Sequence, residues 1–326
     1  MIHLERIWVV GAGAIGSVLA ALLTRASARR GDPRGAGAPP PRIILVGESA
    51  HWAAVRKTGL VFECGLPAGT RVRLETATPE SIPDLTDTDL VLLAGKLTRL
   101  AETLHRLSTR LAPPARLLAV QNGLGIDALV ERALGRTPER GLVYFGAHVA
   151  APGRVRYFPG RMRLRSGPAA AALARLLESE LPGEVAADFR TAEWEKLAVN
   201  CIANPLAAIL GVRNAVLGDA SLNGLKEALL AEVRAVARAE GIELSVTVDD
   251  FNAYITGPTG GNTPSMAVDL ARGEPTEIEF INGAVVSLGR RQAIAVPVNA
   301  GIADLVRFLA GKGKEAPPAL PRPAGG

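Results

Sequence analysis

A glycine-rich turn near the amino terminus constrains the fold of this chain more than any other feature. An apolar run ending at Val10 predicts a buried β-strand, and it leads into Gly11-Ala12-Gly13-Ala14-Ile15-Gly16 and an expected helix over residues 17–25. This order of strand, Gly-x-Gly-x-x-Gly turn and helix is typical of dinucleotide binding, because it brings the backbone and a helix N-terminus up to a pyrophosphate. The motif therefore predicts a Rossmann-type α/β fold and a cofactor-binding role for these six residues.

The same apolar run also fits a secretory signal. Residues 7–23 carry no charge, Arg6 precedes them, and small residues follow at Ala26-Ser27-Ala28. However, the apolar core of a signal does not need three glycines at this spacing, and the run is short for a membrane span. We therefore expect a cytoplasmic protein without a membrane partner.

Composition narrows the function classes further. The chain has 326 residues, of which 48% are hydrophobic, enough for two domains of ordinary size. Its two cysteines, Cys64 and Cys201, predict no disulfide framework, and with four scattered histidines they offer no metal site of zinc spacing. The net charge of +5 comes mainly from arginines that are not interleaved with aromatic residues, so no nucleic-acid partner is expected.

The pattern of elements changes at about residue 190. Before it, apolar strands alternate with helices, which predicts a doubly wound, mostly parallel sheet in a dinucleotide-binding domain of residues 1–190. After it, an all-helical substrate domain of residues 191–312 is expected, with helices over residues 193–210, 222–240, 248–254, 265–271 and 276–291. Glycine and proline predict an exposed loop over 30–41, and the proline-rich residues 313–326 predict a disordered tail.

Three polar residues in the first of these helices form a candidate site. Lys196, Asn200 and Asn204 follow one another at intervals of four and so project from one helix face. A lysine beside two amides can bind a carboxylate and protonate an alkoxide, and Pro205 predicts a kink near them. The alternative is a solvated stripe of an amphipathic helix, and the pattern alone leaves both open.

Two later segments are weaker signals when taken alone. Asn262-Thr263-Pro264-Ser265 precedes an expected helix, for which Ser265 would be an ordinary N-cap. Glu277 follows a proline in the first turn of another expected helix, where an acidic residue commonly compensates the helix dipole.

Together and in this order, the motifs resemble the ketopantoate reductase (2-dehydropantoate 2-reductase) family over residues 7–308. The resemblance begins with the glycine motif, Lys96 and Gln121-Asn122-Gly123-Leu124-Gly125. It continues with Lys196-Leu197-Ala198-Val199-Asn200-Cys201-Ile202-Ala203-Asn204-Pro205, Pro264-Ser265-Met266, Thr276-Glu277-Ile278-Glu279, Ile281-Asn282-Gly283 and Val296-Pro297-Val298-Asn299.

The resemblance implies a role for each matching residue. Lys196 would be the general acid, and Glu277 would orient it or contact the nicotinamide ribose. The substrate would be held by Asn200, Asn204, Asn214 and Ser265, with Asn262 nearby. Asn122 would lie between substrate and nicotinamide, and Lys96 and Ala150 would contact the cofactor.

One position departs from the family pattern. Where the family usually has an arginine for the 2′-phosphate of NADPH, this chain has Glu48, placed further beyond Gly16 than the usual spacing of about 20 because the 30–41 loop intervenes. An acidic residue there suits the ribose hydroxyls of NADH and repels a 2′-phosphate. The expected cofactor is therefore NAD(P)H with NADH favoured, although Glu48 as a simple helix cap and Lys96 as an NADPH contact leave NADPH open.

The implied reaction is the reduction of a 2-oxo acid, ketopantoate, to (R)-pantoate in pantothenate biosynthesis. Two alternatives stay open: a D-2-hydroxyacid dehydrogenase of the same fold acting on another branched 2-oxo acid, and a non-catalytic NAD(P)-binding regulator. The expected partner is a small-molecule 2-oxo acid. The oligomeric state is open, with a homodimer as one candidate.

Overall fold

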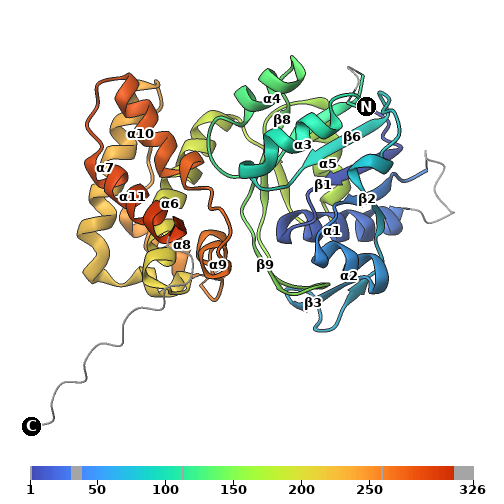
Figure 1. Cartoon of the computed structure of the whole chain (residues 1–326), viewed down its shortest axis with the longest axis horizontal. Helices are drawn as coiled ribbons and strands as arrows, with labels where there is room; N and C mark the ends of the chain where they lie inside the picture. The colour runs from blue at the N-terminus through green and yellow to red at the C-terminus, as the bar shows by residue number, and fades with distance from the viewer. Residues whose placement is uncertain (1, 31–38, 112–113, 258–259, 312–326) are drawn as a thin grey trace, which may run out of the picture.

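The chain folds into an α/β part followed by a helical part, which lie side by side (Figure 1). The computed structural model describes residues 2–30, 39–111, 114–257 and 260–311. The predicted tail 313–326 and most of the predicted loop 30–41 lie outside these residues. No helix within them is long and apolar enough to cross a membrane.

The large sheet of the α/β part has the strand order of a dinucleotide-binding fold. In spatial order its strands are β12 (Gly183–Val185), β11 (Met162–Leu164), β8 (Glu139–Val143), β7 (Arg116–Ala119), β6 (Asp89–Leu93), β1 (Arg6–Val10), β2 (Arg42–Val46) and β5 (Glu75–Ala77). From β5 to β8 all pairings are parallel, and only β11 runs antiparallel to its neighbour β8. Read from β5 to β8, the order of the parallel strands along the chain is 3-2-1-4-5-6, with the switch point between β1 and β6. The predicted Rossmann fold class is confirmed.

Helices cover both faces of this sheet, so its strands are apolar without alternation. Ile7 and Val9 of β1 pack into one core with α1 (Ala14–Arg30) and α5 (Pro168–Leu177). Trp8 and Val10 point to the other face and pack with α3 (Leu100–Leu107) and α4 (Ile126–Leu134). Residues 7–23 form most of β1, the glycine turn and the first part of α1. They are therefore part of the folded α/β core.

A smaller four-stranded sheet lies beside the first (Figure 1). Its strands, in spatial order, are β4 (Arg71–Val72), β3 (Leu60–Cys64), β10 (Arg154–Phe158) and β9 (Gly146–Ala151). The helix α2 (Ala50–Thr58) leads into it and is capped by the Ser49 side chain, which accepts a hydrogen bond from the Trp52 N–H at 3.2 Å.

The helical part begins with α6 and agrees with most of the predicted helices. Its α-helices are α6 (Phe189–Leu210), α7 (Asn223–Ala239), α8 (Val248–Thr256), α9 (Ser265–Arg272), α10 (Asn282–Arg291) and α11 (Pro297–Gly311). The prediction missed α11. The single helix predicted over 276–291 was wrong, because Ile281 adopts φ −111° and ψ −102° between the short 3₁₀ turn η5 (Ile278–Phe280) and α10.

Pro205 does not interrupt α6, which runs to Leu210 as one helix. A proline leaves the carbonyl four residues earlier without its N–H donor, here that of Cys201. The buried Asn282 side chain donates to this carbonyl oxygen at 3.0 Å and to Asn299 Oδ1 at 3.0 Å. A side chain of α10 therefore replaces the bond that Pro205 removes, and this tethers α10 and α11 to α6.

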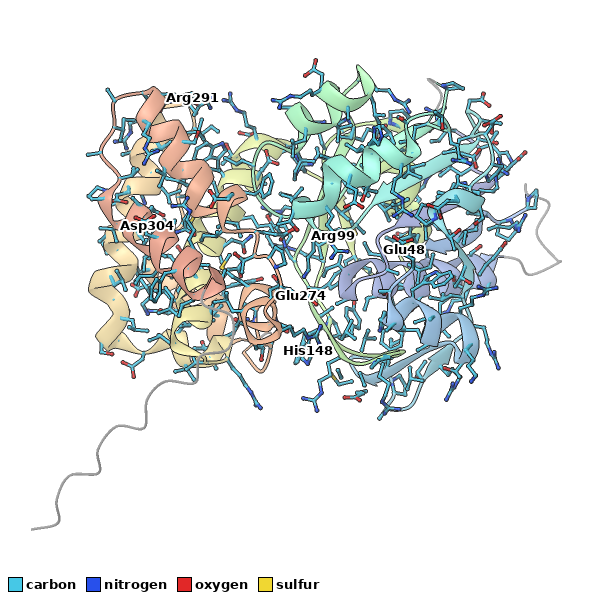
Figure 2. The ribbon with its side chains drawn as sticks, in the orientation of Figure 1. Glu48, Arg99, His148, Glu274, Arg291 and Asp304 are labelled. Atoms are coloured by element: carbon cyan, nitrogen blue, oxygen red, sulfur yellow. The ribbon has the colours of Figure 1, made fainter. Side chains whose placement is uncertain are left out.

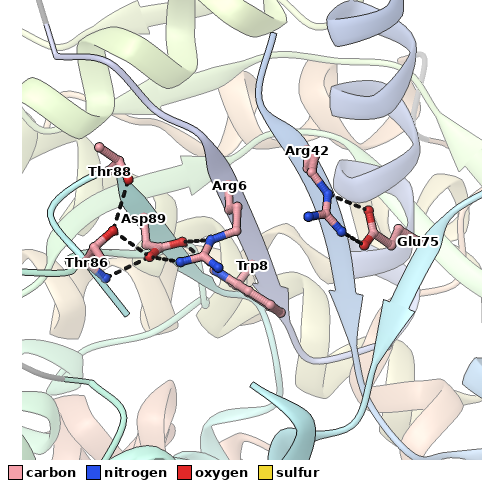
Figure 3. Close-up of polar contacts among 7 residues, drawn as sticks. All are labelled: Arg6, Trp8, Arg42, Glu75, Thr86, Thr88 and Asp89. Carbon is pink, nitrogen blue, oxygen red and sulfur yellow. Dashed lines mark hydrogen bonds and ion pairs between the residues drawn. The ribbon is translucent and has the colours of Figure 1, made fainter. Parts of the chain in front are cut away.

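A fully buried carboxylate, Asp89, anchors the amino ends of β1 and β6 (Figure 3). It accepts two hydrogen bonds from Arg6 at 2.6 and 2.7 Å, one from Trp8 Nε1 at 2.9 Å and one from the Thr86 N–H at 2.7 Å. Burial alone would raise the pKa of Asp89, but the donors outweigh burial and hold the pKa below its usual value.

We expect Asp89→Asn to lower the free energy of unfolding by about 3 kcal/mol, because it removes the buried charge that these donors satisfy and leaves the partly buried Arg6 without its charge partner. Since the pKa is lower in the folded than in the unfolded chain, this contribution is complete above about pH 4 and is lost as the pH falls through the folded-state pKa. Urea unfolding at pH 7 and below pH 4 measures both effects. Glu75→Gln, which breaks the exposed Arg42–Glu75 pair of the same figure, is the control and should cost less than about 1 kcal/mol.

Candidate active site

The glycine motif forms a close turn with free space at its centre. Gly11 has φ +111°, and a Cβ there would lie 2.3 Å from the Gly95 nitrogen. A Cβ at Gly16 would lie 2.0 Å from the Gly11 oxygen, so α1 packs directly on the turn. A Cβ at Gly13, in contrast, would meet nothing within 4 Å in the described part of the chain. This space at the N-terminus of α1 fits a pyrophosphate, and Ala12, Ala14 and Ile15 complete the turn around it.

The predicted site residues of the α/β part gather at the carboxyl edge of the parallel sheet. Gly11 follows β1, Lys96 follows β6, Asn122 follows β7, and β8 ends at Val143. In an open α/β sheet this edge is where ligands bind. The helical part closes over it: the Leu124 N–H donates to the Phe280 carbonyl oxygen at 3.0 Å.

Lys196 reaches this edge from α6. The residue is half-buried, its ammonium donates to the Val143 carbonyl oxygen at 2.5 Å, and it lies 5.0 Å from the centroid of the Tyr144 ring. Burial, the largest cause, and the positive charge of Arg140 together lower the pKa of Lys196 to about 7, while the negative charge of Glu193 opposes them. An ammonium group with this pKa is a good proton donor near neutral pH.

Three of the predicted site amides carry buried polar atoms that no described residue satisfies. The buried atoms without a hydrogen-bond partner include Nδ2 of Asn200 and Oδ1 of Asn122 and Asn262. Buried polar groups are normally paired, so three such atoms from predicted site residues favour a polar ligand between them. Asn204 lies half-buried one turn beyond Asn200 on α6.

The remaining predicted substrate residues lie in the helical part. Asn214 is buried, and its N–H donates to the Asn262 carbonyl oxygen at 3.0 Å, which holds these two residues together. A Cβ at Gly146 would lie 3.0 Å from the Asn262 side chain, so Asn262 rests on the start of β9. Ser265 is exposed and is the first residue of α9; the N-cap is Pro264, so the expectation of a Ser265 cap was wrong.

Glu277 and Lys96 connect the two parts of the molecule. Glu277 Oε1 accepts from the Leu97 N–H at 2.8 Å, and burial raises the pKa of this carboxyl to about 7. Lys96 donates to Asp269 at 2.8 Å and to Glu274 at 2.5 Å. Figure 2 shows Glu274 where the helical part faces the α/β part. In this structure Glu277 is bonded to Leu97 while Lys196 is bonded to Val143, so the described contacts do not join the two predicted catalytic residues.

Two further predicted cofactor residues, Ala150 and Glu48, are exposed, and Glu48 has a partner that the sequence did not predict. Ala150 is exposed in β9. Glu48 is exposed, follows the end of β2, and accepts two hydrogen bonds from Arg106 at 2.6 and 2.9 Å. Arg106 also bonds Glu80, and its hydrogen bonds hold the pKa of Glu48 below the usual value.

Several residues that shape the site were not predicted from the sequence. They are Arg106 at Glu48, Asp269 and Glu274 at Lys96, Arg140, Glu193 and Tyr144 at Lys196, and His148, whose buried Nδ1 has no partner in the described structure. Two of them carried a usable sequence signal: Asp269 belongs to the residues that carry the family resemblance, and Glu193 precedes Lys196 by three residues on the same helix face.

Two protein-family profiles together match nearly the whole chain. The family profile described as "Ketopantoate reductase PanE/ApbA" matches residues 7–169, and "Ketopantoate reductase PanE/ApbA C terminal" matches residues 188–310. A 2-dehydropantoate 2-reductase of Halobacterium salinarum is 33% identical over 93% of this chain and 98% of its own length. One of Pyrococcus abyssi is 28% identical over 95% of this chain and 98% of its own length.

Solved structures support the same relationship. A PanE/ApbA family ketopantoate reductase from Ralstonia eutropha JMP134 superposes with a TM-score of 0.80 at 28% identity, over 94% of this chain and 99% of its own. A D-mandelate dehydrogenase, solved with NADH and anilino(oxo)acetate, has a TM-score of 0.80 at 25% identity over 94% and 99%.

Proposed function

Because the chain belongs to the ketopantoate reductase family, we propose that it reduces 2-dehydropantoate to (R)-pantoate, a step of pantothenate biosynthesis. The observation that carries this proposal is Lys196, a lysine with a pKa of about 7 at the carboxyl edge of the sheet, beside amide atoms that lack partners. The cofactor is a nicotinamide dinucleotide, which supplies a hydride to the C2 carbonyl carbon of the substrate when it is bound.

The side chains of the site donate the proton, bind the substrate and keep the site closed. Lys196 donates a proton to the C2 oxygen as negative charge develops there, and the Val143 carbonyl holds the amine in place. The unpaired Nδ2 of Asn200 is a hydrogen-bond donor suited to a carboxylate, and the unpaired Oδ1 atoms of Asn122 and Asn262 accept from substrate hydroxyls. Glu277, bonded to Leu97 N–H, keeps the helical part closed over the edge.

Steady-state kinetics with ketopantoate and a panel of other branched 2-oxo acids test the proposal. We expect the highest kcat/KM with ketopantoate. A higher value with another acid would identify a D-2-hydroxyacid dehydrogenase, as the neighbouring D-mandelate dehydrogenase structure makes worth testing. Tight NADH binding with no turnover of any acid would identify a regulator.

We further propose that NADH is preferred over NADPH. Each oxygen of the Glu48 carboxylate accepts one hydrogen bond from Arg106, and a carboxylate oxygen can accept a second, here from a ribose hydroxyl. A 2′-phosphate, in contrast, would meet the charges of Glu48 and Glu80 and would have to displace them from Arg106. Arg99 also acts electrostatically on Glu48. Its positive charge opposes the proposed preference, because it would attract a 2′-phosphate.

We therefore expect Glu48→Gln to raise the ratio of kcat/KM with NADPH to that with NADH by about 10- to 100-fold. The substitution removes one repelling charge and leaves Arg106 with Glu80 as its one charged partner, so that Arg106 can give the phosphate a charge-assisted hydrogen bond of about 1.5–3 kcal/mol. Initial rates with both cofactors at saturating ketopantoate measure the ratio. Adding Arg106→Met to this variant should remove the gain. Wild-type preference for NADPH, or an unchanged ratio in Glu48→Gln, contradicts the role given to Glu48.

The cytoplasmic location and the homodimer stay predictions. Sedimentation of the purified protein over a range of concentrations tests the dimer. Fractionation of the cells that express the chain tests its location.

A further inference from the structure

We propose that the buried pair of Arg140 and Glu193 is a positioning device that controls how readily Lys196 releases its proton. Arg140 comes from β8 and Glu193 from α6, and their side chains meet at 2.9 Å between Nη2 and Oε1. This proposal rests on the proposed role of Lys196 as the general acid. Arg140 and Glu193 act through Lys196 and are not placed in contact with substrate.

Glu193 would be expected to neutralise Lys196 if it were free to do so. The two residues lie three apart on α6, a spacing at which a carboxylate and an ammonium pair across one helical turn. Arg140 instead forms an ion pair with one oxygen of this carboxylate, without hydrogen-bond geometry, and its own side chain is only 3% exposed. Arg140 also pairs with Asp127 at 3.4 Å, and Asp127 pairs with Arg165 at 2.6 Å. The Glu193 carboxylate, one helical turn before Lys196, is therefore engaged by Arg140, which is linked in turn to Asp127 and Arg165.

The ammonium of Lys196 is directed toward the end of β8 and not toward Glu193. It donates to the Val143 carbonyl oxygen and lies over the Tyr144 ring. The Tyr144 hydroxyl donates to the Ala192 carbonyl oxygen at 3.3 Å, which ties this ring to the start of α6. The lysine is thus held by an uncharged acceptor and a π face, neither of which neutralises its charge.

The other charged groups around Lys196 come from two further places. Arg161 and Arg163 lie 5.6 and 5.9 Å from the centroid of the same Tyr144 ring, and Arg163 is paired with Glu184. Glu195, the residue before Lys196, accepts a hydrogen bond from Ser245 at 3.0 Å. Arg140 and Glu193 are the charged residues whose fields act directly on the lysine, and they act in opposite directions: Arg140 lowers the pKa of Lys196 and Glu193 raises it.

Two substitutions should therefore move the protonation of Lys196 in opposite directions. Arg140→Met removes a repelling charge, so Lys196 keeps its proton to higher pH. Glu193→Gln removes an attracting charge, so Lys196 loses its proton at lower pH. We expect the alkaline limb of the kcat/KM profile for ketopantoate reduction to shift up in the first variant and down in the second, each by about 0.5 to 1 pH unit.

The experiment combines the pH profiles with a direct titration of the lysine. Competitive labelling with acetic anhydride, read by mass spectrometry of the peptide that contains Lys196, follows the free amine in the folded protein without turnover. Arg140→Lys, which keeps the charge, should restore the wild-type limb. Arg238→Met, the same substitution at the exposed Arg238–Glu243 pair, is the matched control and should leave profile and labelling unchanged.

Opposite shifts in the two variants support the proposal. Unchanged alkaline limbs, or shifts in the same direction, overturn it. A purely structural role for the pair would lower the rate in both variants without shifting their alkaline limbs in opposite directions. If Arg140→Met does not fold, the downward shift in Glu193→Gln alone decides the question. If the wild-type protein turns over no 2-oxo acid, the proposed function is wrong, and if Lys196→Ala retains turnover, the role of Lys196 as the acid is wrong. In both cases the labelling titration of the Arg140 and Glu193 variants still decides whether the pair controls the lysine.

Discussion

Replacing Lys196 with alanine is expected to lower kcat for ketopantoate reduction by about 100- to 10,000-fold while NADH still binds. A positioned general acid contributes an effect of this size, and Lys196 has the required pKa of about 7 and position at the carboxyl edge of the sheet. The glycine turn that would hold the pyrophosphate is formed by β1 and α1, so cofactor affinity should not change. Initial rates measure kcat, and fluorescence titration with NADH measures the affinity for the cofactor.

The pH dependence supplies an internal check on this result. Because Lys196 acts in its protonated form, the wild-type rate of reduction should fall as the pH rises through about 7, and this limb should be absent in Lys196→Ala. Lys57→Ala, at an exposed lysine of α2, serves as the control and should keep both rate and limb. Full turnover in the alanine variant would remove Lys196 from the mechanism.

The second large effect is expected at Gly13. Gly13→Val should weaken NADH binding by about 10- to 100-fold, because the valine side chain fills the space in which backbone N–H groups would bond the pyrophosphate. The melting temperature should not fall, since nothing described lies within 4 Å of a Cβ at this position. Calorimetric titration with NADH and thermal unfolding of the free protein measure both.

Two other glycines make the comparison specific. Gly301→Val introduces the same side chain on the exposed surface of α11 and should change neither binding nor stability. Gly16→Ala should lower the melting temperature even without cofactor, because its Cβ would lie 2.0 Å from the Gly11 oxygen. If Gly13→Val binds NADH as the wild type does, the pyrophosphate does not lie over this turn.

Features that depend on neighbouring residues could be predicted from the sequence. The strand, glycine turn and helix at residues 6–30 follow from backbone conformation and apolar runs, and the alternation of strands and helices predicted the sheet. The common face of Lys196, Asn200 and Asn204 follows from helix geometry. Contacts from distant segments could not be predicted: the kink at Pro205 stays a prediction, but nothing near it in the sequence indicates that Asn282 from α10 supplies the missing donor.

The partners of charged side chains could not be predicted in the same way. Glu48 was recognised as the residue after the second strand, but Arg106 lies on α3 and reaches it only because β2 and β6 flank β1 in the sheet. Likewise Arg140 meets Glu193 because α6 packs against the end of β8.

The sequence by itself determined the class of fold, and it predicted the dinucleotide site and, through the family resemblance, the candidate acid Lys196. Each of these depends on motifs of residues close together along the chain. The tertiary structure decided the electrostatic setting of these residues: which charge faces Glu48, what holds Lys96 and what keeps Glu193 from Lys196. The physical reason is that a charge acts through space over several ångströms, so its effect depends on which segments the fold brings together and how far it excludes water.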